Sequence, residues 1–103
     1  MSEPLNGGHF YEVHGSQAIV KAFRQVQQRA IHEHRGQEMV TALVTLRHRL
    51  QRDPLKFGEP LYRLAALRMQ VRTAVVGPLV VSFGVCEDRP MVFIKSVSLL
   101  SKR

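Results

Sequence analysis

Three apolar runs with short breaks between them constrain the fold of this chain more than any other feature, and they occupy residues 68–76, 79–85 and 91–100. In the first run apolar residues alternate with polar and basic ones, which is typical of a strand with one buried face. The second run alternates large and small apolar side chains, as strands at the centre of a sheet do. Gly77-Pro78 and the polar stretch 86–90 are turn formers, and such short connections join antiparallel neighbours. The sequence therefore predicts a three-stranded antiparallel meander.

The first half of the chain carries two stripes of apolar residues at helical spacing. They are Ile19, Phe23, Val26 and Ala30, followed by Met39, Leu43, Leu46 and Leu50. We expect Ser16 to cap the first helix and Gly36 to end it, while Asp53-Pro54 ends the second. Both stripes need an apolar surface to cover, and one face of the sheet supplies it. The other face is then expected to stay at least partly open.

The predicted fold class is α+β, with a short N-terminal strand and a helical hairpin packed on one face of an antiparallel three-stranded meander. The short strand is expected at residues 10–14, and residues 55–66 are expected to form a connector. Residues 1–9 are expected to form a flexible leader before a single domain at residues 10–103. A chain of 103 residues can bury a core without covalent staples.

Composition limits the cellular compartment in which the protein is expected and the chemical class of its partner. The single cysteine, Cys86, excludes an internal disulfide framework, and no segment resembles a signal peptide or a membrane span. A cytoplasmic protein without membrane contact is expected. The formal net charge is +7, and it is uneven: residues 54–103 hold eight basic and three acidic groups, a net charge of +5. This excess favours a polyanionic partner, either nucleic acid or an acidic protein segment, although excess arginine can also simply maintain solubility.

Seven basic residues are the candidates for contacts with nucleic acid: Lys56, Arg63, Arg68, Arg72, Lys95, Lys102 and Arg103. Arg68 and Arg72 are four residues apart, which on a strand places them on one face about 13–14 Å apart, near twice the phosphate spacing. Lys56, Tyr62 and Arg63 combine cations with an aromatic ring that can stack on a base, although residues that anchor a connector would look much the same.

A ribonuclease mechanism would give four of the side chains catalytic roles. The guanidinium groups of Arg68 and Arg72 could stabilise the pentacoordinate phosphate that forms when a ribose 2′-hydroxyl attacks its phosphodiester. Glu59 and Tyr62 are the candidates for the proton acceptor and donor. The five histidines have no metal-binding spacing, and the sequence contains no phosphate-binding glycine loop or dinucleotide fingerprint, so no metal and no small-molecule cofactor is expected.

The order of these elements and several local motifs resemble the RelE/ParE superfamily of bacterial toxins. The motifs are Leu50-Gln51-Arg52-Asp53-Pro54, the connector FGEPLYRL, GPLVVSFGV at residues 77–85 and MVFIKSV at residues 91–97. The resemblance implies a toxin of a type II toxin–antitoxin system, neutralised by a partner antitoxin, whose basic sheet face engages the ribosome and its mRNA or, alternatively, DNA gyrase. Positions 78–79 and 98–100 depart from the usual catalytic pattern of the ribosome-dependent members.

Three functional hypotheses follow. The first is a toxin that inhibits translation by binding ribosome-associated mRNA, with or without cleavage. The second is a catalytically silent member of the superfamily that acts by binding gyrase or an antitoxin. The third is a general nucleic-acid-binding module, whose affinity would fall steeply with salt and would show no sequence preference.

Overall fold

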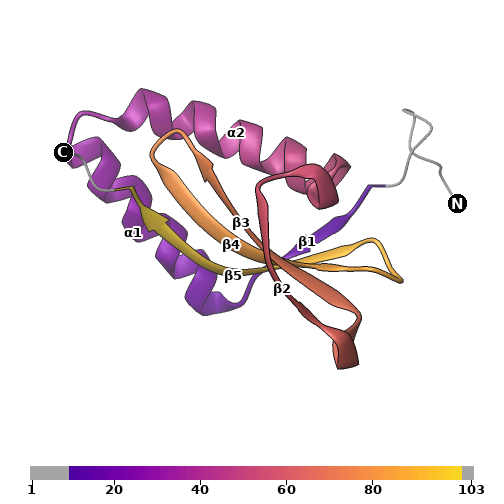
Figure 1. The fold of residues 1–103 in the computed structure, drawn as a ribbon. Coiled ribbons are helices and arrows are strands. Elements are labelled where there is room, and N and C mark those ends of the chain that lie inside the picture. Colours follow the sequence, from indigo (N-terminus) through magenta and orange to yellow (C-terminus); the bar gives the residue numbers. More distant parts are fainter. Residues whose placement is uncertain (1–9, 101–103) are drawn as a thin grey trace, which may run out of the picture.

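The computed structural model describes residues 10–100, and the predicted leader at residues 1–9 lies outside them. Its elements in chain order are β1 (Glu12–His14), α1 (Gln17–His32), α2 (Gly36–Arg52), the 3₁₀ turn η1 (Pro54–Lys56), β2 (Glu59–Leu64), the 3₁₀ turn η2 (Ala65–Leu67), β3 (Met69–Val76), β4 (Leu79–Cys86) and β5 (Met91–Leu99) (Figure 1). The predicted α+β fold class is confirmed.

The five strands form one sheet in the order β1-β5-β4-β3-β2. The predicted meander is confirmed as β3, β4 and β5, and β1 pairs with β5 in parallel. The prediction that residues 55–66 are only a connector is wrong, because β2 pairs antiparallel with β3 at the edge of the sheet. An edge strand contacts one neighbour only, so β2 is mostly exposed, tolerates Pro60 and lacks the alternation that marks a half-buried strand.

The two helices begin and end close to the predicted residues. The Ser16 hydroxyl accepts a hydrogen bond from the Ile19 amide at 3.3 Å, as expected of a helix cap. Gly36 does not end α1, because it is the first residue of α2. His34 instead makes the turn with a left-handed φ of 61°. The buried Arg35 beside it donates to the Leu100 carbonyl at 3.2 Å, which ties the helical hairpin to the end of β5.

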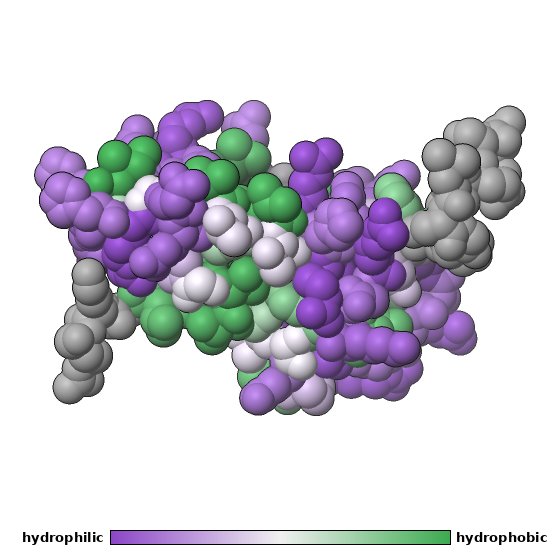
Figure 2. Space-filling model, turned by 90° about the horizontal axis from the view of Figure 1, so that it is seen from above, coloured by the Kyte–Doolittle hydropathy of each residue, from purple (hydrophilic) through white to green (hydrophobic). Residues whose placement is uncertain are grey.

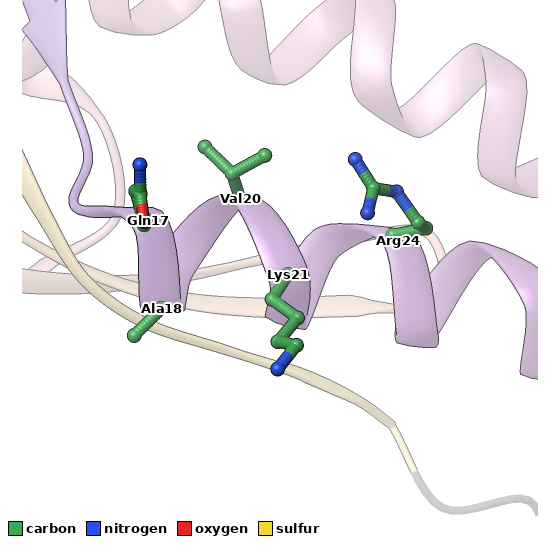
Figure 3. Close-up of a pocket in the computed structure, with 5 residues that line it drawn as sticks. All are labelled: Gln17, Ala18, Val20, Lys21 and Arg24. Atoms are coloured by element: carbon green, nitrogen blue, oxygen red, sulfur yellow. The ribbon is translucent and has the colours of Figure 1, made fainter.

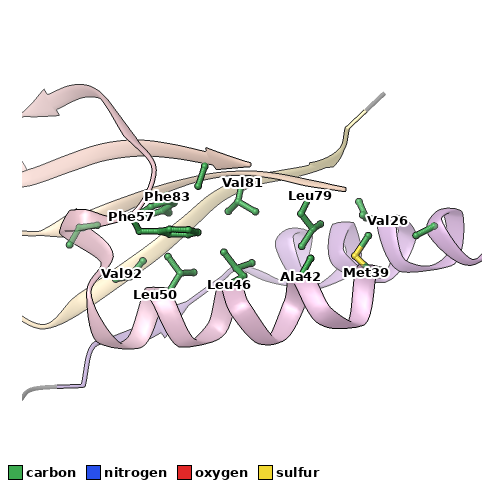
Figure 4. Close-up of a cluster of buried hydrophobic side chains, with 13 residues drawn as sticks. Val26, Met39, Ala42, Leu46, Leu50, Phe57, Leu79, Val81, Phe83 and Val92 are labelled. Carbon is green, nitrogen blue, oxygen red and sulfur yellow. The ribbon is translucent and has the colours of Figure 1, made fainter. Parts of the chain in front are cut away.

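One hydrophobic core fills the space between the helices and the sheet (Figure 4). Leu79, Val81, Phe83 and Val85 point from β4 toward the helices and are fully buried. They meet Ala42, Leu46 and Leu50 of α2 and Val26 and Ala30 of α1. We call this side of the sheet the helical face. Side chains alternate along a strand, so the residues between these positions lie on the opposite side, the open face.

Candidate functional site

The strand register defines two neighbouring rows of side chains across the middle of the open face. The first row crosses four strands through Glu59, Thr73, Ser82 and Ser96. The second crosses five strands through Tyr62, Val71, Gly84, Phe93 and His14. Paired positions on adjacent strands lie about 4.5–5.5 Å apart, so each row is a continuous strip. The middle of the open face therefore carries one polar strip and one strip that is largely aromatic and apolar.

The polar strip offers hydroxyl and carboxylate groups to a ligand. The Thr73 hydroxyl already donates to the Val81 carbonyl at 3.2 Å, whereas Glu59 and Ser96 are exposed to solvent. Hydroxyl groups can both donate and accept hydrogen bonds, so they suit a ligand with mixed polar groups such as ribose and phosphate. An ionised carboxylate next to these hydroxyls accepts hydrogen bonds but cannot donate them.

The second strip has aromatic rings at both ends and a methionine over its centre. The Tyr62 residue at the β2 edge is 49% exposed, and at the other end His14 stacks on Phe93 with ring centroids 5.3 Å apart. Between them Gly84 leaves room for the Met69 side chain, which occupies the place that a Cβ at Gly84 would need. Exposed rings of this kind can stack on nucleobases.

The predicted pair of phosphate-binding arginines on one strand face is not formed. The Arg72 side chain lies on the helical face, because Arg72 is opposite Phe83 in the register, and the residue is only 7% exposed. It donates from Nε to the Phe57 carbonyl at 2.9 Å and from its terminal nitrogen to the Gly58 carbonyl at 3.1 Å. A guanidinium satisfied in this way is a structural clamp rather than a phosphate contact.

Arg68, the other member of the pair, does not belong to a strand. It follows η2 with a left-handed φ of 49°, and β3 begins at the next residue. The alternation of side chains along β3 therefore does not extend to it. Arg68 is exposed at the end of the sheet, where its carbonyl accepts from the Glu87 amide at 2.8 Å. The prediction that Arg68 and Arg72 share a strand face is therefore wrong.

Arg63 is already paired with an acidic side chain. Its Nε and terminal nitrogen each donate to a Glu87 carboxylate oxygen at 2.7 Å, which is the two-point geometry that suits guanidinium and carboxylate. The hydrogen bonds from Arg63 hold the pKa of the Glu87 carboxyl below its ordinary value and raise the pKa of Arg63. A phosphate would have to compete with Glu87 for this guanidinium.

The other predicted basic contacts are scattered. Lys56 is exposed in η1, and Lys95 is exposed at an irregularity of β5, where Ser82 pairs with Ser96 and Phe83 pairs with Ile94. Lys102 and Arg103 lie outside the described residues. Over residues 10–100 the strand positions of the open face carry no arginine. The expectation of an arginine-rich open face is wrong for the part of the chain that the structure describes.

Glu59 and Tyr62 are brought to the same side of β2. Glu59 pairs with Thr73 and Tyr62 with Val71, and a register shift between positions 60 and 62 keeps both on the open face although they are three residues apart. A carboxylate and a phenol so placed can act as proton acceptor and donor. Phosphodiester cleavage also needs a cation to stabilise the developing charge. Lys56 and Arg68 are the exposed basic residues that flank β2 in the sequence.

The Arg72 clamp belongs to a larger arrangement that sequence reasoning missed. The terminal nitrogen of Arg49 donates to the Lys56 carbonyl at 3.2 Å, so the carbonyls of residues 56, 57 and 58 all accept from arginines. Gly58 adopts a left-handed φ of 70°, and a Cβ there would collide with the Thr73 carbonyl. These contacts fix the start of β2, and with it Glu59. Gly58 within FGEP was the available sequence signal, since a glycine often marks a close backbone approach.

The polar strip was also missed, and its signal was present in the sequence. Thr73, Ser82 and Ser96 are polar residues with apolar residues on both sides or on one side in their strands. Their alignment across strands depends on register, which three separate strand predictions do not provide.

A surface hollow lies on the helical side of the molecule, away from the open face. A hollow of about 700 Å³ runs beside α1 and is lined by Gln17, Ala18, Val20, Lys21 and Arg24 (Figure 3). Figure 3 shows Lys21 pointing toward β5 and Arg24 pointing toward α2, so these cations do not converge on one point. Among residues 10–100 no cluster of three or more His, Cys, Asp or Glu side chains could hold a metal ion. No helix in this range has the length and apolar character needed to cross a membrane.

Two helices on one face of this mixed sheet define a RelE-like fold. One chain of the crystal structure of the toxin–antitoxin complex RelBE2 from Mycobacterium tuberculosis has the same fold, with a TM-score of 0.65 and 18% sequence identity. The similarity covers 91% of this chain and 95% of that chain. No family model matches the sequence, and neither does any curated protein. The RelE-like architecture expected from the sequence is confirmed, and at this identity the likeness concerns the fold.

Proposed function

We propose that this chain is the toxin of a type II toxin–antitoxin system and inhibits translation in the bacterial cytoplasm by binding ribosome-associated mRNA. The observation that carries the proposal is the RelE-like fold, which matches a chain of a toxin–antitoxin complex over 91% of the length of this chain. The open face of the sheet is the proposed mRNA surface. An antitoxin is the proposed partner that neutralises it.

Stacking and hydrogen bonding, more than ion pairing, support the choice of single-stranded RNA for the open face. Tyr62 is half exposed on this face, and each base has a flat surface that can stack on its ring. The row of Ser and Thr hydroxyls beside it can bond to ribose 2′-hydroxyls and phosphate oxygens. Lys56, Arg68 and Lys95 would supply the positive charge, together with Lys102 and Arg103.

Binding without efficient cleavage is the form of the proposal that the geometry favours. Glu59 and Tyr62 could transfer protons, but Arg72 is committed to backbone carbonyls and Arg63 to Glu87. Arg68 remains the proposed source of a catalytic guanidinium. Its exposed position at the end of the sheet leaves its side chain free to reorient on binding RNA.

Induced expression in a bacterial host tests this proposal. We expect growth arrest and a loss of labelled amino-acid incorporation, and we expect ribosome-bound mRNA to be protected rather than cut when transcript ends are mapped. Tyr62→Ala should weaken the inhibition, while Val44→Ala, which alters an exposed apolar residue on α2, should keep it. Normal growth and normal incorporation in cells that contain the folded protein would contradict the proposal.

A protein target is the second candidate, and exposed apolar residues on the helices favour it. Val20, Ile31, Val40 and Val44 are between 53% and 66% exposed. Figure 2 shows hydrophobic side chains gathered over the left-hand part of the side that α2 covers. An apolar partner segment could cover them, whether it belongs to an antitoxin or to gyrase. Relaxation of plasmid DNA on expression, with translation unaffected, would favour gyrase over mRNA.

A further inference from the structure

A second hollow on the helical side lies between the two helices and the neighbouring edge of the sheet. Figure 1 shows α1 and α2 diverging from their common turn, and this hollow of about 400 Å³ lies away from that turn. Large apolar side chains from four elements form its walls: Val13 of β1, Phe23 of α1, Leu43 of α2 and Ile94 of β5. We call it the apolar hollow.

The floor of the apolar hollow belongs to the hydrophobic core. Leu46 and Leu50 line it as well, and both are almost fully buried. Figure 4 shows these two side chains pointing from α2 toward the sheet. The walls keep more of their surface in water, because Val13 is 36% exposed and the other three wall residues are half-buried. The hollow is therefore an apolar depression that reaches from the surface to the core.

Backbone hydrogen bonds fix the elements around the apolar hollow. The Tyr11 amide donates to the Gln51 carbonyl at 2.8 Å, which joins the start of β1 to the last turn of α2. On its other side β1 pairs with β5, where Val13 is the partner of Val92. A preformed site loses little conformational freedom when a ligand binds, and most small-molecule sites are largely preformed. The walls of this hollow are therefore in place before any ligand arrives.

Two polar side chains of α2, those of Arg47 and Gln51, also line the apolar hollow. Of its described lining residues only Arg47 is charged, and Arg47 forms no ion pair within residues 10–100. Arg47 is exposed, so it lies at the rim rather than the floor. A guanidinium group can bind a carboxylate through two parallel hydrogen bonds, and an amide can donate to the same carboxylate. The hollow therefore combines apolar walls with one cation at its rim.

We propose that the apolar hollow binds a small amphipathic carboxylate, with its alkyl chain among the apolar walls and its head group on Arg47. The site lies apart from the open face, and the inference goes beyond the proposed function. An apolar cavity of about 150 Å³ holds a benzene-sized molecule, so a hollow of about 400 Å³ that is open on one side has room for a chain of roughly eight to ten carbons. Medium-chain fatty acids are molecules of this class.

A small ligand suits the apolar hollow better than a nucleic acid or a second copy of the chain. Nucleic-acid binding depends on several cations, and only one described cation lines the hollow. A second copy carries the same formal net charge of +7, so electrostatic repulsion opposes its approach. Small-molecule sites are concave and mostly apolar, with a few polar groups that orient the ligand. An apolar side chain of a partner protein could also fill the hollow, and a titration with carboxylates distinguishes the two.

Calorimetric titration of the full chain with hexanoate, octanoate and decanoate, each below its micelle concentration, tests the proposal. We expect one carboxylate to bind per chain, and each added pair of methylenes should raise the affinity by up to about 15-fold until the hollow is filled. Val13→Phe should lower the affinity for decanoate at least about tenfold, because the added ring takes the place of several methylenes. Val75→Phe is the matched control, since Val75 is an exposed strand valine outside the hollow, and it should leave the affinity nearly unchanged.

The head group is tested by a second pair of variants. Arg47→Gln should lower the affinity for decanoate by about two- to fivefold, as expected for an exposed ion pair, whereas Arg68→Gln makes the same change in net charge and should have little effect. Thermal melting checks that all variants are folded, and Leu43→Phe fills the hollow from α2 if Val13→Phe destabilises β1.

Absence of saturable binding at all three chain lengths would overturn the inference and leave the hollow to a segment of a partner protein. Equal losses in the two Phe variants, or in the two Gln variants, would overturn it as well. Inhibition of translation is measured separately and does not depend on carboxylate binding. The proposed function can therefore fail while this inference holds, and the reverse.

Discussion

Replacing Arg72 with methionine separates its role as a clamp from the phosphate contact that its sequence position suggests. Methionine has a side chain of similar reach but no donors. The Phe57 and Gly58 carbonyls would both lose the hydrogen bonds that Arg72 now makes to them. A buried acceptor that loses its partner costs about 1–3 kcal/mol, so we expect a loss of about 2–4 kcal/mol in the free energy of unfolding.

Thermal and urea denaturation measure this loss directly. For a domain of this size, about 1 kcal/mol corresponds to about 4–8 °C in Tm, so Arg72→Met should lower Tm by at least about 8 °C. Arg72→Lys keeps the charge but cannot span two carbonyls with a fork, and its Tm should fall between those of Arg72→Met and the parent. Arg68→Met is the matched control, because that exposed arginine should change stability by no more than about 0.5 kcal/mol.

RNA binding gives the complementary result. At a temperature where all variants are folded, Arg72→Met should bind single-stranded RNA with nearly the affinity of the parent, whereas Arg68→Met should bind more weakly. The reasoning is refuted if Arg72→Met melts within about 3 °C of the parent and loses more RNA affinity than Arg68→Met.

Three further predictions concern local contacts. Gly58→Ala should destabilise the fold by more than about 2 kcal/mol in urea denaturation, because Gly58 has a positive φ and a Cβ would meet the Thr73 carbonyl; near-parental stability would contradict this. Ser16→Ala should cost about 1 kcal/mol by loss of the helix cap, and no change would show that the bond to Ile19 contributes nothing. Arg63 lowers the pKa of Glu87 in the folded state. The ion pair therefore stabilises the fold above the ordinary value of 4.5, and this stabilisation is lost as pH falls through the folded-state pKa. The drop in Tm between pH 6 and pH 3 should be smaller in Glu87→Gln than in the parent, and equal drops would contradict the prediction.

Much of the fold followed from local patterns. The helical stripes ending at Ala30 and Leu50, the Ser16 cap and the meander of β3 to β5 are present as the sequence predicts. These features repeat every two or every 3.6 residues, so a short window of sequence reveals them. The edge strand β2 was missed because it is exposed on both sides and shows no such period.

The candidate site was predicted less well, because a site depends on what each side chain contacts. Glu59 and Tyr62 do share the open face, although the spacing of three residues alone would place them on opposite faces of a regular strand. Arg68 and Arg72 have the spacing for a shared face but do not share one, since Arg68 is the left-handed residue between η2 and β3. Both outcomes result from local irregularities of the backbone, a register shift in one case and a left-handed residue in the other.

The sequence by itself determined the two helices and their buried faces, the three strands of the meander, the buried face of β4, and the excess of positive charge. These properties depend on the order of residues and on their hydrophobicity, which a linear reading contains. Only the tertiary structure decided which cations remain unneutralised. Arg63 finds Glu87 from 24 residues away and Arg72 finds Phe57 from 15 residues away. Such pairings form when strands align in space, and so the charge left for a polyanionic ligand depends on contacts that composition does not encode.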